Sequence, residues 1–484
     1  MGMRTFKPYN PDQLYLLPPV LRDWLPEGHL ALFLSDVVDT LDLESIFDDY
    51  EQGDGRGQPP YHPAMMVKLL IYGYCMGKPS SRKLERASYE DVSYRVLCAE
   101  QHPDHDSIAE FRKRHLKALA GLFVQVLRLC QRAGLVKLGH VALDGTKVKA
   151  NASKHKAMSY ERMCKAEQEL EQEVKRLLEL AEKVDGAEER EYGRKRGNEL
   201  PAELARRESR LVKIRQAKAE LEEEARQRAE QAAAEAQAKI AERGLKEQQT
   251  GKKARGREPT VVDPQQAVPE PKAQRNFTDA DSRIMKDGAT GGFVQGYNCQ
   301  AVVDSQAQII VAAALTQEAN DKQQLVPMLL AVEKNTGEKP AKASADAGYF
   351  SQAQITDNQL QDIDLYVAPE RLRHGKKIAE VGDQAPPSAQ PTLIEQMREK
   401  LKTAQGHAVY KMRKAIVEPV FGQIKEARGF RRFSLRGEPK VGLEWQLICL
   451  THNLLKLFRA KVCLQGLKIR IKAGMRLVEG TNAV

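Results

Sequence analysis

Apolar residues in the first third of the chain follow the spacing of α-helices. A run of large apolar residues from Met65 to Tyr72 predicts an apolar helix that ends before a Gly-Lys-Pro sequence. Shorter helices are predicted over 82–87 and 108–119, whereas residues 1–60 are rich in loop formers. Basic residues on the short helices allow two interpretations, a helix-turn-helix-like DNA reader or a helical bundle with solvated basic faces. The pattern predicts an all-helical N-terminal domain over residues 1–135.

From residue 136 the pattern changes to apolar stretches of strand length, separated by helical segments. The first stretch predicts a buried strand that ends in a turn, and two later stretches predict a hairpin with its turn at 304–307. Strands separated by helices, together with a strand hairpin, predict an α/β core whose strands run in mixed directions. The predicted strands are 140–145, 296–303, 308–315, 342–346 and 364–367, and the predicted helices are about 321–334 and 394–425.

Between the first strand and the others, residues 156–250 carry the pattern of two long helices. Leu170, Leu177 and Val184 recur at heptad spacing among Glu, Lys, Arg, Ala and Gln, which is the composition of a coiled coil. Glycine and proline interrupt the pattern midway, so an inserted antiparallel helical hairpin is predicted. Its favoured role is a structural or oligomerisation arm, and direct contact with DNA is the alternative.

The insertion divides the predicted core into residues 136–155 and 276–460. A polar segment with four prolines, residues 251–275, predicts a linker between the insertion and the second part of the core. Residues 461–484 are predicted to form a basic C-terminal tail.

Composition narrows the class of protein. The chain has 484 residues, of which 42% are hydrophobic and 29% are charged, enough for a substantial core. No apolar run approaches the roughly 20 residues that span a bilayer, and the N-terminus lacks a signal-peptide pattern, so neither membrane residence nor secretion is expected. The seven cysteines are scattered and never spaced as C-x-x-C, which argues against a disulfide framework or a cysteine zinc cluster. A reducing cytoplasm is the expected location.

Positive charge is concentrated near the C-terminus. Residues 391–484 contain 19 Lys and Arg against 7 Asp and Glu, a net charge of +12, and since the whole chain carries +10, the rest carries −2. Such concentration is typical of proteins that contact phosphate groups. Alternatively, the basic residues pair with nearby acids on a solvated surface. The candidates for phosphate contact are Arg413, Lys425, Arg431, Arg432 and Arg436, and the acids of the alternative are Glu426, Glu438 and Glu444.

Three acidic residues stand out by their positions. Asp144 and Asp346 each end a predicted strand, and Glu418 lies in the basic C-terminal segment. Carboxylates at strand ends and on an adjoining helix can converge on divalent cations, and two such ions about 4 Å apart can activate a hydroxyl for phosphodiester transfer. Each acid alone has an ordinary alternative, because an Asp after a strand is usually part of a turn and a helical Glu usually forms a salt bridge.

Six short motifs are distributed along the chain: Leu143–Thr146, Thr278–Arg283, Gln295–Asn298, Ala345–Tyr349, Val417–Lys425 and Gly429–Gly437. Together they resemble the bacterial insertion-sequence DDE transposases, in the branch with a Tyr-x-x-Arg…Glu…Lys signature. Residues 62–115 resemble the helical domain that precedes the core in these proteins. The resemblance covers most of residues 1–460.

The resemblance implies an RNase H-like mixed sheet with flanking helices. It also implies that three acids of this sheet and its helices bind two Mg²⁺ ions, which Mn²⁺ is expected to replace. The matching positions, which the resemblance makes both catalytic and metal-binding, are Asp144, Asp346 and Glu418.

The accessory positions of the signature lie on the same segment as Glu418. Four residues separate Arg413 from Glu418 where the family usually has three, and Lys414 has the usual spacing. We assign the signature arginine to Arg413, because Lys414 would displace the tyrosine. Pro419 predicts that Glu418 lies at a helix break or a helix start. The accessory residues, which the resemblance makes DNA-binding, are Tyr410, Arg413 and Lys425.

The function that the resemblance implies is DNA transposition. Such an enzyme binds the terminal inverted repeats of its insertion sequence, cuts the double-stranded DNA at their ends and joins the 3′-hydroxyl ends to target DNA. Because two ends must be held together, a homodimer or a larger assembly is expected, associated with the bacterial nucleoid. Two alternatives stay open: a non-catalytic DNA-binding protein derived from a transposase, and a metal-dependent nuclease without strand transfer.

Overall fold

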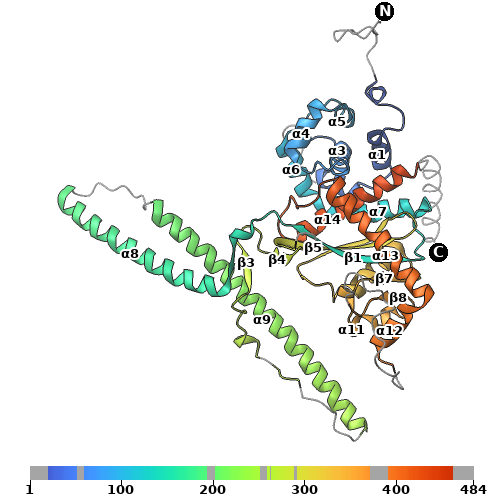
Figure 1. Cartoon of the computed structure of the whole chain (residues 1–484). Helices are drawn as coiled ribbons and strands as arrows, with labels where there is room; N and C mark the ends of the chain where they lie inside the picture. Colours follow the sequence, from blue (N-terminus) through green and yellow to red (C-terminus); the bar gives the residue numbers. More distant parts are fainter. Residues whose placement is uncertain are drawn as a thin grey trace, which may run out of the picture.

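The computed structural model describes residues 20–51, 59–192, 202–250, 259–261, 263–287, 291–370 and 391–461. A mixed sheet lies at the centre, the N-terminal helices lie to one side of it, and two long helices project away from it (Figure 1). The predicted α/β class with a mixed sheet and flanking helices is confirmed. No helix among the described residues is both long and apolar enough to cross a membrane. The predicted tail lies almost wholly outside the described residues, which end at 461.

The central sheet combines antiparallel and parallel pairing. Its strand order is β4-β5-β1-β7-β8, and β6 pairs with β5. Strand β5 is antiparallel to β1, β4 and β6, whereas β1, β7 and β8 are parallel to one another. The strands are β1 (Val141–Lys149), β4 (Arg283–Lys286), β5 (Phe293–Asp304), β6 (Ile310–Thr316), β7 (Lys342–Ala345) and β8 (Asp364–Val367).

Strand β1 is longer than the sequence predicts. The prediction of a turn at Gly145 is wrong, because β1 pairs with β5 along its whole length and continues to Lys149. Its parallel pairing with β7, by contrast, covers only Val141 to Leu143. Asp144 therefore lies inside β1, at the point where β7 ceases to accompany it.

The other predicted strands lie close to the apolar stretches that predict them, whereas β4 was not predicted. Strands β5 and β6 form the predicted hairpin, and β7 and β8 are the two predicted short strands. The helix after β6 begins later than predicted. Helix α10 spans Leu325–Thr336, so residues 317–324 form a loop at the edge of the sheet.

The N-terminal region is helical, and its core is continuous with that of the sheet. Residues 30–38 and 44–51 form helices although the sequence predicts loops, because Leu34, Val37 and Val38 give α1 a fully buried face. Helices α3 and α7 pack on the C-terminal helix α14, so one hydrophobic core extends from the helices to the strands. The helices are α1 (Leu30–Val38), α2 (Glu44–Glu51), α3 (Pro63–Cys75), α4 (Ser81–Glu90), α5 (Val92–Leu97), α6 (His105–Arg114), α7 (Leu116–Arg132) and α14 (Glu438–Arg459).

Helix α13 (Ala404–Gly422) follows α12 (Leu393–Lys402) and carries the signature segment. The predicted break at Pro419 is wrong, because α13 continues through this residue and then forms a π-helical turn, Gln423–Ala427. A helical proline leaves the carbonyl four residues earlier without its usual donor. Gln308 supplies a replacement, since its Nε2 donates to the Ala415 carbonyl at 2.9 Å.

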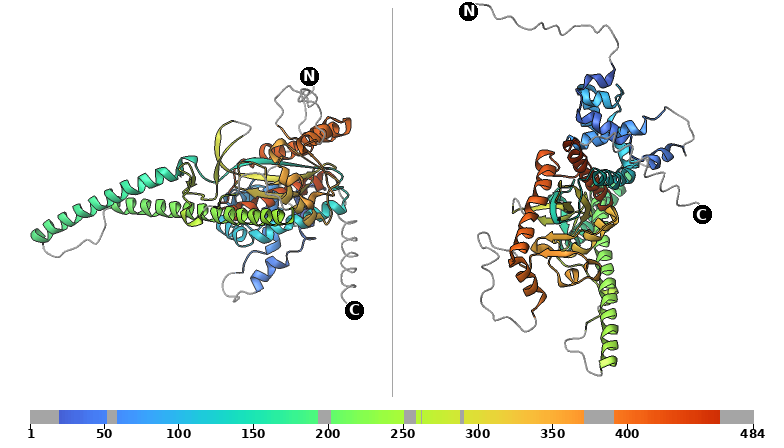
Figure 2. Two further views of the ribbon diagram at one scale, coloured as in Figure 1. Left: turned by 90° about the horizontal axis from the view of Figure 1, so that it is seen from below. Right: turned by 90° about the vertical axis from the view of Figure 1, so that its right-hand side faces the viewer.

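The insertion forms the predicted pair of long helices (Figures 1 and 2). Helix α8 spans Tyr160–Tyr192 and α9 spans Ala202–Thr250, and the turn between them lies outside the described residues. The predicted linker leads into strand β3 (Gln274–Asn276), which pairs with β2 (Ala157–Ser159) at the base of the hairpin. The two helices enclose a small core of their own, made of Met163, Leu170, Leu211, Ile214, Ala217 and Leu221.

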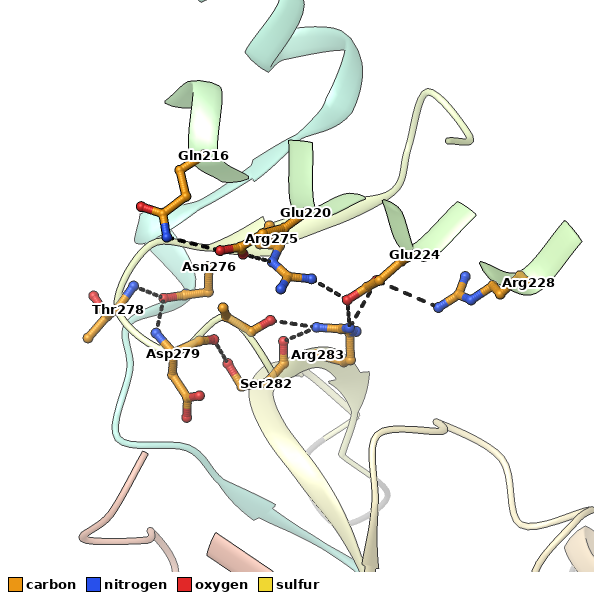
Figure 3. Close-up of polar contacts among 11 residues, drawn as sticks. Gln216, Glu220, Glu224, Arg228, Arg275, Asn276, Thr278, Asp279, Ser282 and Arg283 are labelled. Carbon is orange, nitrogen blue, oxygen red and sulfur yellow. Dashed lines mark hydrogen bonds and ion pairs between the residues drawn. The ribbon is translucent and has the colours of Figure 1, made fainter. Parts of the chain in front are cut away.

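Ion pairs fix α9 to the sheet side of the molecule (Figure 3). Arg275 of β3 donates from Nε to Glu220 Oε2 at 2.8 Å and also pairs with Glu224. Arg283 of β4 donates to Glu224 Oε1 at 3.1 Å. Because both arginines are largely buried, these contacts hold the arm at a fixed position on the core.

Candidate active site

The predicted aspartates of β1 and β7 lie side by side. Leu143 and Ala345 form the last pair of the parallel ladder, so the next residues, Asp144 and Asp346, leave the ladder at the same end. Asp346 Oδ1 accepts a hydrogen bond from Gly348 N at 2.8 Å and so caps the short turn that follows. Parallel pairing therefore brings together two acids that are far apart in the sequence.

Helix α13 directs a cation toward these aspartates. Arg413 Nη1 lies 3.4 Å from Asp144 Oδ2, and the Arg413 side chain is 9% exposed. The guanidinium also lies over the Tyr410 ring, 5.8 Å from its centroid. Lys414, the other candidate for the signature position, is exposed. Of the two cations, Arg413 is the one that contacts the acidic pair.

A third carboxylate, which the sequence did not single out, belongs to the same neighbourhood. Asp321 lies in the loop between β6 and α10, and its Oδ1 accepts hydrogen bonds from Asn298 Nδ2 and Gln300 Nε2, both at 2.6 Å. Lys147 Nζ is 4.0 Å from the same oxygen. The apolar pattern assigned Asp321 to the start of a helix, where an acid is unremarkable as a cap. Only the antiparallel pairing of β5 with β1 brings its two amide donors to the site.

The electrostatics of the site favour a bound cation. Burial raises the pKa of Asp144 to about 7, the charge of Arg413 opposes this rise, and the charges of Asp346 and Asp321 add to it. Burial likewise lowers the pKa of Lys147. Buried acids with raised pKa values and like-charged neighbours are typical of functional sites, because a cation would relieve their repulsion.

Glu418 lies apart from this group in its orientation. On α13 the buried face contains Arg413, Val417 and Val420, whereas Glu418 is exposed. At 100° per residue, the five positions between Arg413 and Glu418 turn the glutamate about 140° away from the arginine. Among the described residues, the Glu418 carboxylate has no hydrogen-bond or ion-pair partner. The structure thus brings Asp144 and Asp346 together without Glu418 between them.

Apart from Tyr410 and Arg413 of α13, the predicted DNA-contacting residues lie along the π-helical turn and the loop after it. Lys425 is partly buried, and burial lowers its pKa. Arg431 pairs with Glu426, as the alternative interpretation expects. Arg432 is exposed, and Arg436 is exposed and donates from Nε to the Asn151 carbonyl at 2.9 Å.

The other two acids of that alternative have different partners. Glu438 accepts from Gln317 Nε2 at 2.6 Å, and the buried Glu444 accepts from the backbone of Ser434 and Leu435. The loop 428–437 runs beside the end of β1, where the backbone of Arg432 forms an isolated parallel β-bridge with that of Lys149.

The donor set allows a specific test of fit to a divalent cation. The described residues contain no group of three or more His, Cys, Asp or Glu side chains that could hold a metal ion. Mg²⁺, however, usually binds through one or two carboxylates, with waters and substrate phosphate oxygens completing its octahedron. Asp144 and Asp346 offer two hard oxygen donors at a point of excess negative charge. The pair therefore fits a Mg²⁺ ion that is also held by a phosphate substrate.

Comparisons with known proteins match two parts of the chain. Residues 19–114 match the family model of a transposase domain (DUF772). Residues 385–458 match the family model of a transposase DDE domain. The second match contains Tyr410, Arg413 and Glu418, whereas Asp144 and Asp346 lie outside both matches. No curated protein and no solved structure matches the chain.

Proposed function

We propose a function for this chain that starts from the two family matches, which support an insertion-sequence DDE transposase. The chain binds the terminal inverted repeats of its element and cuts the DNA at their ends. It then joins the 3′-hydroxyl ends to target DNA. The observation that carries this proposal is the convergence of Asp144 and Asp346 at the end of the parallel ladder, with Arg413 beside Asp144. Acids and a guanidinium at one point suit a phosphodiester substrate.

The topology of the sheet supports an RNase H-like core. Strands β6, β5 and β1 are successively antiparallel, and β7 and β8 then extend the sheet parallel to β1. An acid on the central strand and a second acid after its parallel neighbour are what the family resemblance implies for such a core. We therefore assign the catalytic core to this sheet and to α13.

Asp144 and Asp346 would hold divalent cations in this core, Mg²⁺ by preference and two ions as the family implies. When bound, such ions act as Lewis acids on phosphoryl oxygens and lower the pKa of a water or hydroxyl nucleophile. In the reaction, water attacks the scissile phosphorus and the 3′-oxygen leaves as a hydroxyl. That hydroxyl then attacks a phosphorus of the target strand, loses its proton and displaces the 3′-oxygen of the adjoining target nucleotide, which leaves as a hydroxyl, so no covalent protein–DNA bond is needed.

Arg413 binds and orients the phosphate in this scheme. Its Nη1 is close to Asp144, while its buried Nε has no hydrogen-bond partner within the described structure. A non-bridging phosphate oxygen would satisfy this donor, since guanidinium groups bind phosphate in a bidentate manner. Tyr410 supports the guanidinium through its ring, and Lys425 is proposed to contact a flanking phosphate.

Glu418 is the proposed third acid on the strength of the family signature. Its exposed carboxylate forms no ion pair within the described residues, and because it is turned about 140° away from Arg413, it would join the aspartates only if α13 reorients when DNA binds. The proposed DNA track continues over Arg431, Arg432 and Arg436, which line the loop beside the end of β1. Exposed Arg82 and Lys83 of α4 are proposed to contribute to the choice of sequence.

Two DNA ends require an assembly of at least two chains. The hairpin of α8 and α9 projects far from the sheet and is fixed at its base, which suits an arm that contacts a second copy. We propose a homodimer or larger assembly in which this arm contributes to the contact between chains.

The test is DNA cleavage by variants of the full chain. Asp144→Asn, Asp346→Asn and Glu418→Gln should each lose at least about a hundredfold in the rate of Mg²⁺-dependent cleavage, because each removes a metal ligand worth several kcal/mol in the transition state. The substrate carries the inverted repeats that flank the coding sequence. DNA binding, measured by gel shift in the same buffer, should change little.

Asp362→Asn is the matched control, because this exposed aspartate pairs with Lys339 away from the site. Cleavage at the wild-type rate by Asp144→Asn or Asp346→Asn would refute the proposed site. Full cleavage by Glu418→Gln alone would remove the glutamate from it. Cleavage without joining would indicate a nuclease, and binding without cleavage by the wild type would indicate a DNA-binding protein.

A further inference from the structure

Asp321 has no role in the function proposed above, although it lies beside the acidic pair. We propose that Asp321 is a further divalent-cation ligand of this site, acting together with Asp346 and with the side-chain carbonyl of Asn298. The inference rests on the proposed function, because it adds ligands to the same site. Its evidence is the position of the carboxylate, the hydrogen bonds that orient it and one buried acceptor that lacks a donor.

Two glycines give the Asp321 carboxylate access to the site. A β-carbon at Gly145 would lie 2.8 Å from Asp321 Oδ1, closer than real β-carbons approach another atom. A β-carbon at Gly348 would lie 3.5 Å from Asp321 Oδ2 and 3.0 Å from Asp346 Oδ1. Asp321 and Asp346 therefore approach the same point beside Gly348, each with one oxygen. A larger residue at either glycine would occupy the space that the carboxylates share.

Hydrogen bonds from the sheet fix the orientation of Asp321. The amides of Asn298 and Gln300 both donate to Oδ1 at 2.6 Å, which leaves Oδ2 without a donor from either amide. Gln300 is held in turn, because Tyr349 Oη donates to its Oε1. This support from fixed neighbours is what a metal ligand requires, since outer hydrogen bonds orient ligating carboxylates.

Asn298 supplies the second and independent observation. Its side chain is fully buried, and its Oδ1 has no hydrogen-bond partner within the described structure. This oxygen lies 3.0 Å from the β-carbon position of Gly145, beside Asp321 Oδ1. A buried carbonyl oxygen without a hydrogen-bond donor is costly. A cation would compensate this cost by binding the oxygen directly or through a water molecule.

The ligand chemistry is that of a hard divalent cation. Two carboxylates and an amide carbonyl offer oxygen only, which suits Mg²⁺ or Mn²⁺ better than zinc. The competing explanation is that Asp321 merely balances the charge of Lys147. At 4.0 Å their contact is long for an ion pair, and two amides already donate to the same carboxylate oxygen.

Binding of Mn²⁺ to the full chain, without DNA, tests the inference. Titration calorimetry should show that Asp321→Asn weakens Mn²⁺ binding at least tenfold relative to the wild type. Glu318→Gln is the matched control, because it removes an exposed charge from the same loop, and it should bind Mn²⁺ like the wild type. Gly348→Ala keeps every charge but places a methyl group between Asp321 and Asp346, and it should also weaken binding.

The outcomes separate this inference from the proposed function. If Asp321→Asn and Gly348→Ala bind Mn²⁺ as tightly as the wild type, or if the wild type binds none, Asp321 is not a ligand. Loss of cleavage in Asp144→Asn would then still uphold the proposed function. Conversely, Mn²⁺ binding that depends on Asp321 in a chain that cuts no DNA would uphold the ligand and refute the function.

Discussion

The sheet edge, by which we mean the end of the sheet where Asp144, Asp346 and Asp321 meet, and the inserted hairpin are both rich in charge. Their charges are arranged in opposite ways. In the hairpin, Glu167 accepts hydrogen bonds from Lys218 at 2.8 Å and Arg215 at 3.1 Å, and these partners lower its pKa. At the sheet edge, burial raises the pKa of Asp144, and the nearby charges of Asp346 and Asp321 raise it further.

The contrast distinguishes structural charges from functional ones. Paired acids stabilise the fold in which they are found, whereas crowded and buried acids cost stability until a ligand compensates them. In this part of the hairpin, the charge of Glu167 is therefore balanced by cations of the same chain, as in a structural scaffold. The sheet edge has an excess of negative charge that a substrate-bound cation would balance.

The largest effect is expected on the cleavage rate, when the arginine that faces acids at the sheet edge is compared with one that faces acids in the hairpin. Arg413→Met should lower the cleavage rate by about a hundredfold, because it removes a cation aimed at the developing charge on phosphate. Arg215→Met, which removes one of the two cations that pair with Glu167, should leave cleavage unchanged. Single-turnover cleavage of a labelled repeat end measures both. Equal losses of cleavage rate in the two variants would show that the arginines of the hairpin and of the site do not differ in function.

The base of the hairpin should matter for stability instead. Arg275→Met leaves Glu220 without its ion-pair partner and leaves Glu224 with Arg283 as its remaining buried partner, and it should cost about 2 kcal/mol of unfolding free energy. Arg228→Met removes an exposed contact of 3.9 Å to the same Glu224 and should cost little. Denaturant unfolding compares them. An unaffected Arg275→Met chain would mean that the arm is not held by these pairs.

DNA binding should also separate the two regions. Replacing Arg431 and Arg432 together by Met should reduce the slope of log K against log salt by about 2, at 0.9 for each lost phosphate contact. Replacing Arg226 and Arg228 of the hairpin, which pair with Glu223 and Glu224, should leave the slope unchanged. Titrations at several salt concentrations measure it. A slope that falls only in the hairpin variant would move the DNA track to the arm.

The smallest effects are expected in the pH dependence of stability, where Asp144 and Glu167 should act with opposite sign. The pKa of Asp144 rises from 3.8 to about 7 on folding, so its stabilising contribution is present below about pH 4 and is lost as the pH rises through 7. The pKa of Glu167 falls below 4.5, so its contribution is present above that value and is lost as the pH falls.

Asp144→Asn should therefore raise the Tm by a few degrees near pH 8 and by less near pH 4. Glu167→Gln should lower the Tm near pH 8, and the loss should shrink toward pH 4. Thermal scans in a chelator-containing buffer measure both trends. A Tm of Asp144→Asn below that of the wild type near pH 8 would show that Arg413 outweighs the cost of burying this charged carboxylate, as the cations of the hairpin do for Glu167.

Much of the architecture followed from local pattern. The β5–β6 hairpin, β7, β8 and the two helices of the insertion lie close to their predicted positions, because apolar periodicity depends on neighbours in sequence. Asp144 and Asp346 were also identified from the sequence, since each follows an apolar stretch that forms a strand. The helices at 30–38 and 44–51 were missed because their short apolar faces lie among loop-forming residues.

The sequence by itself thus determined most of the order of the elements and the inserted arm, and it singled out the two aspartates as candidates. The tertiary structure alone decided which side chains share the site. It extended β1 through Asp144 by pairing with β5, and it supplied Gln308 to the carbonyl that Pro419 leaves free. It also turned Arg413 inward and brought Asp321 to the amides of β5. The physical reason is that each of these contacts joins segments distant in the chain, and no local pattern records such partners.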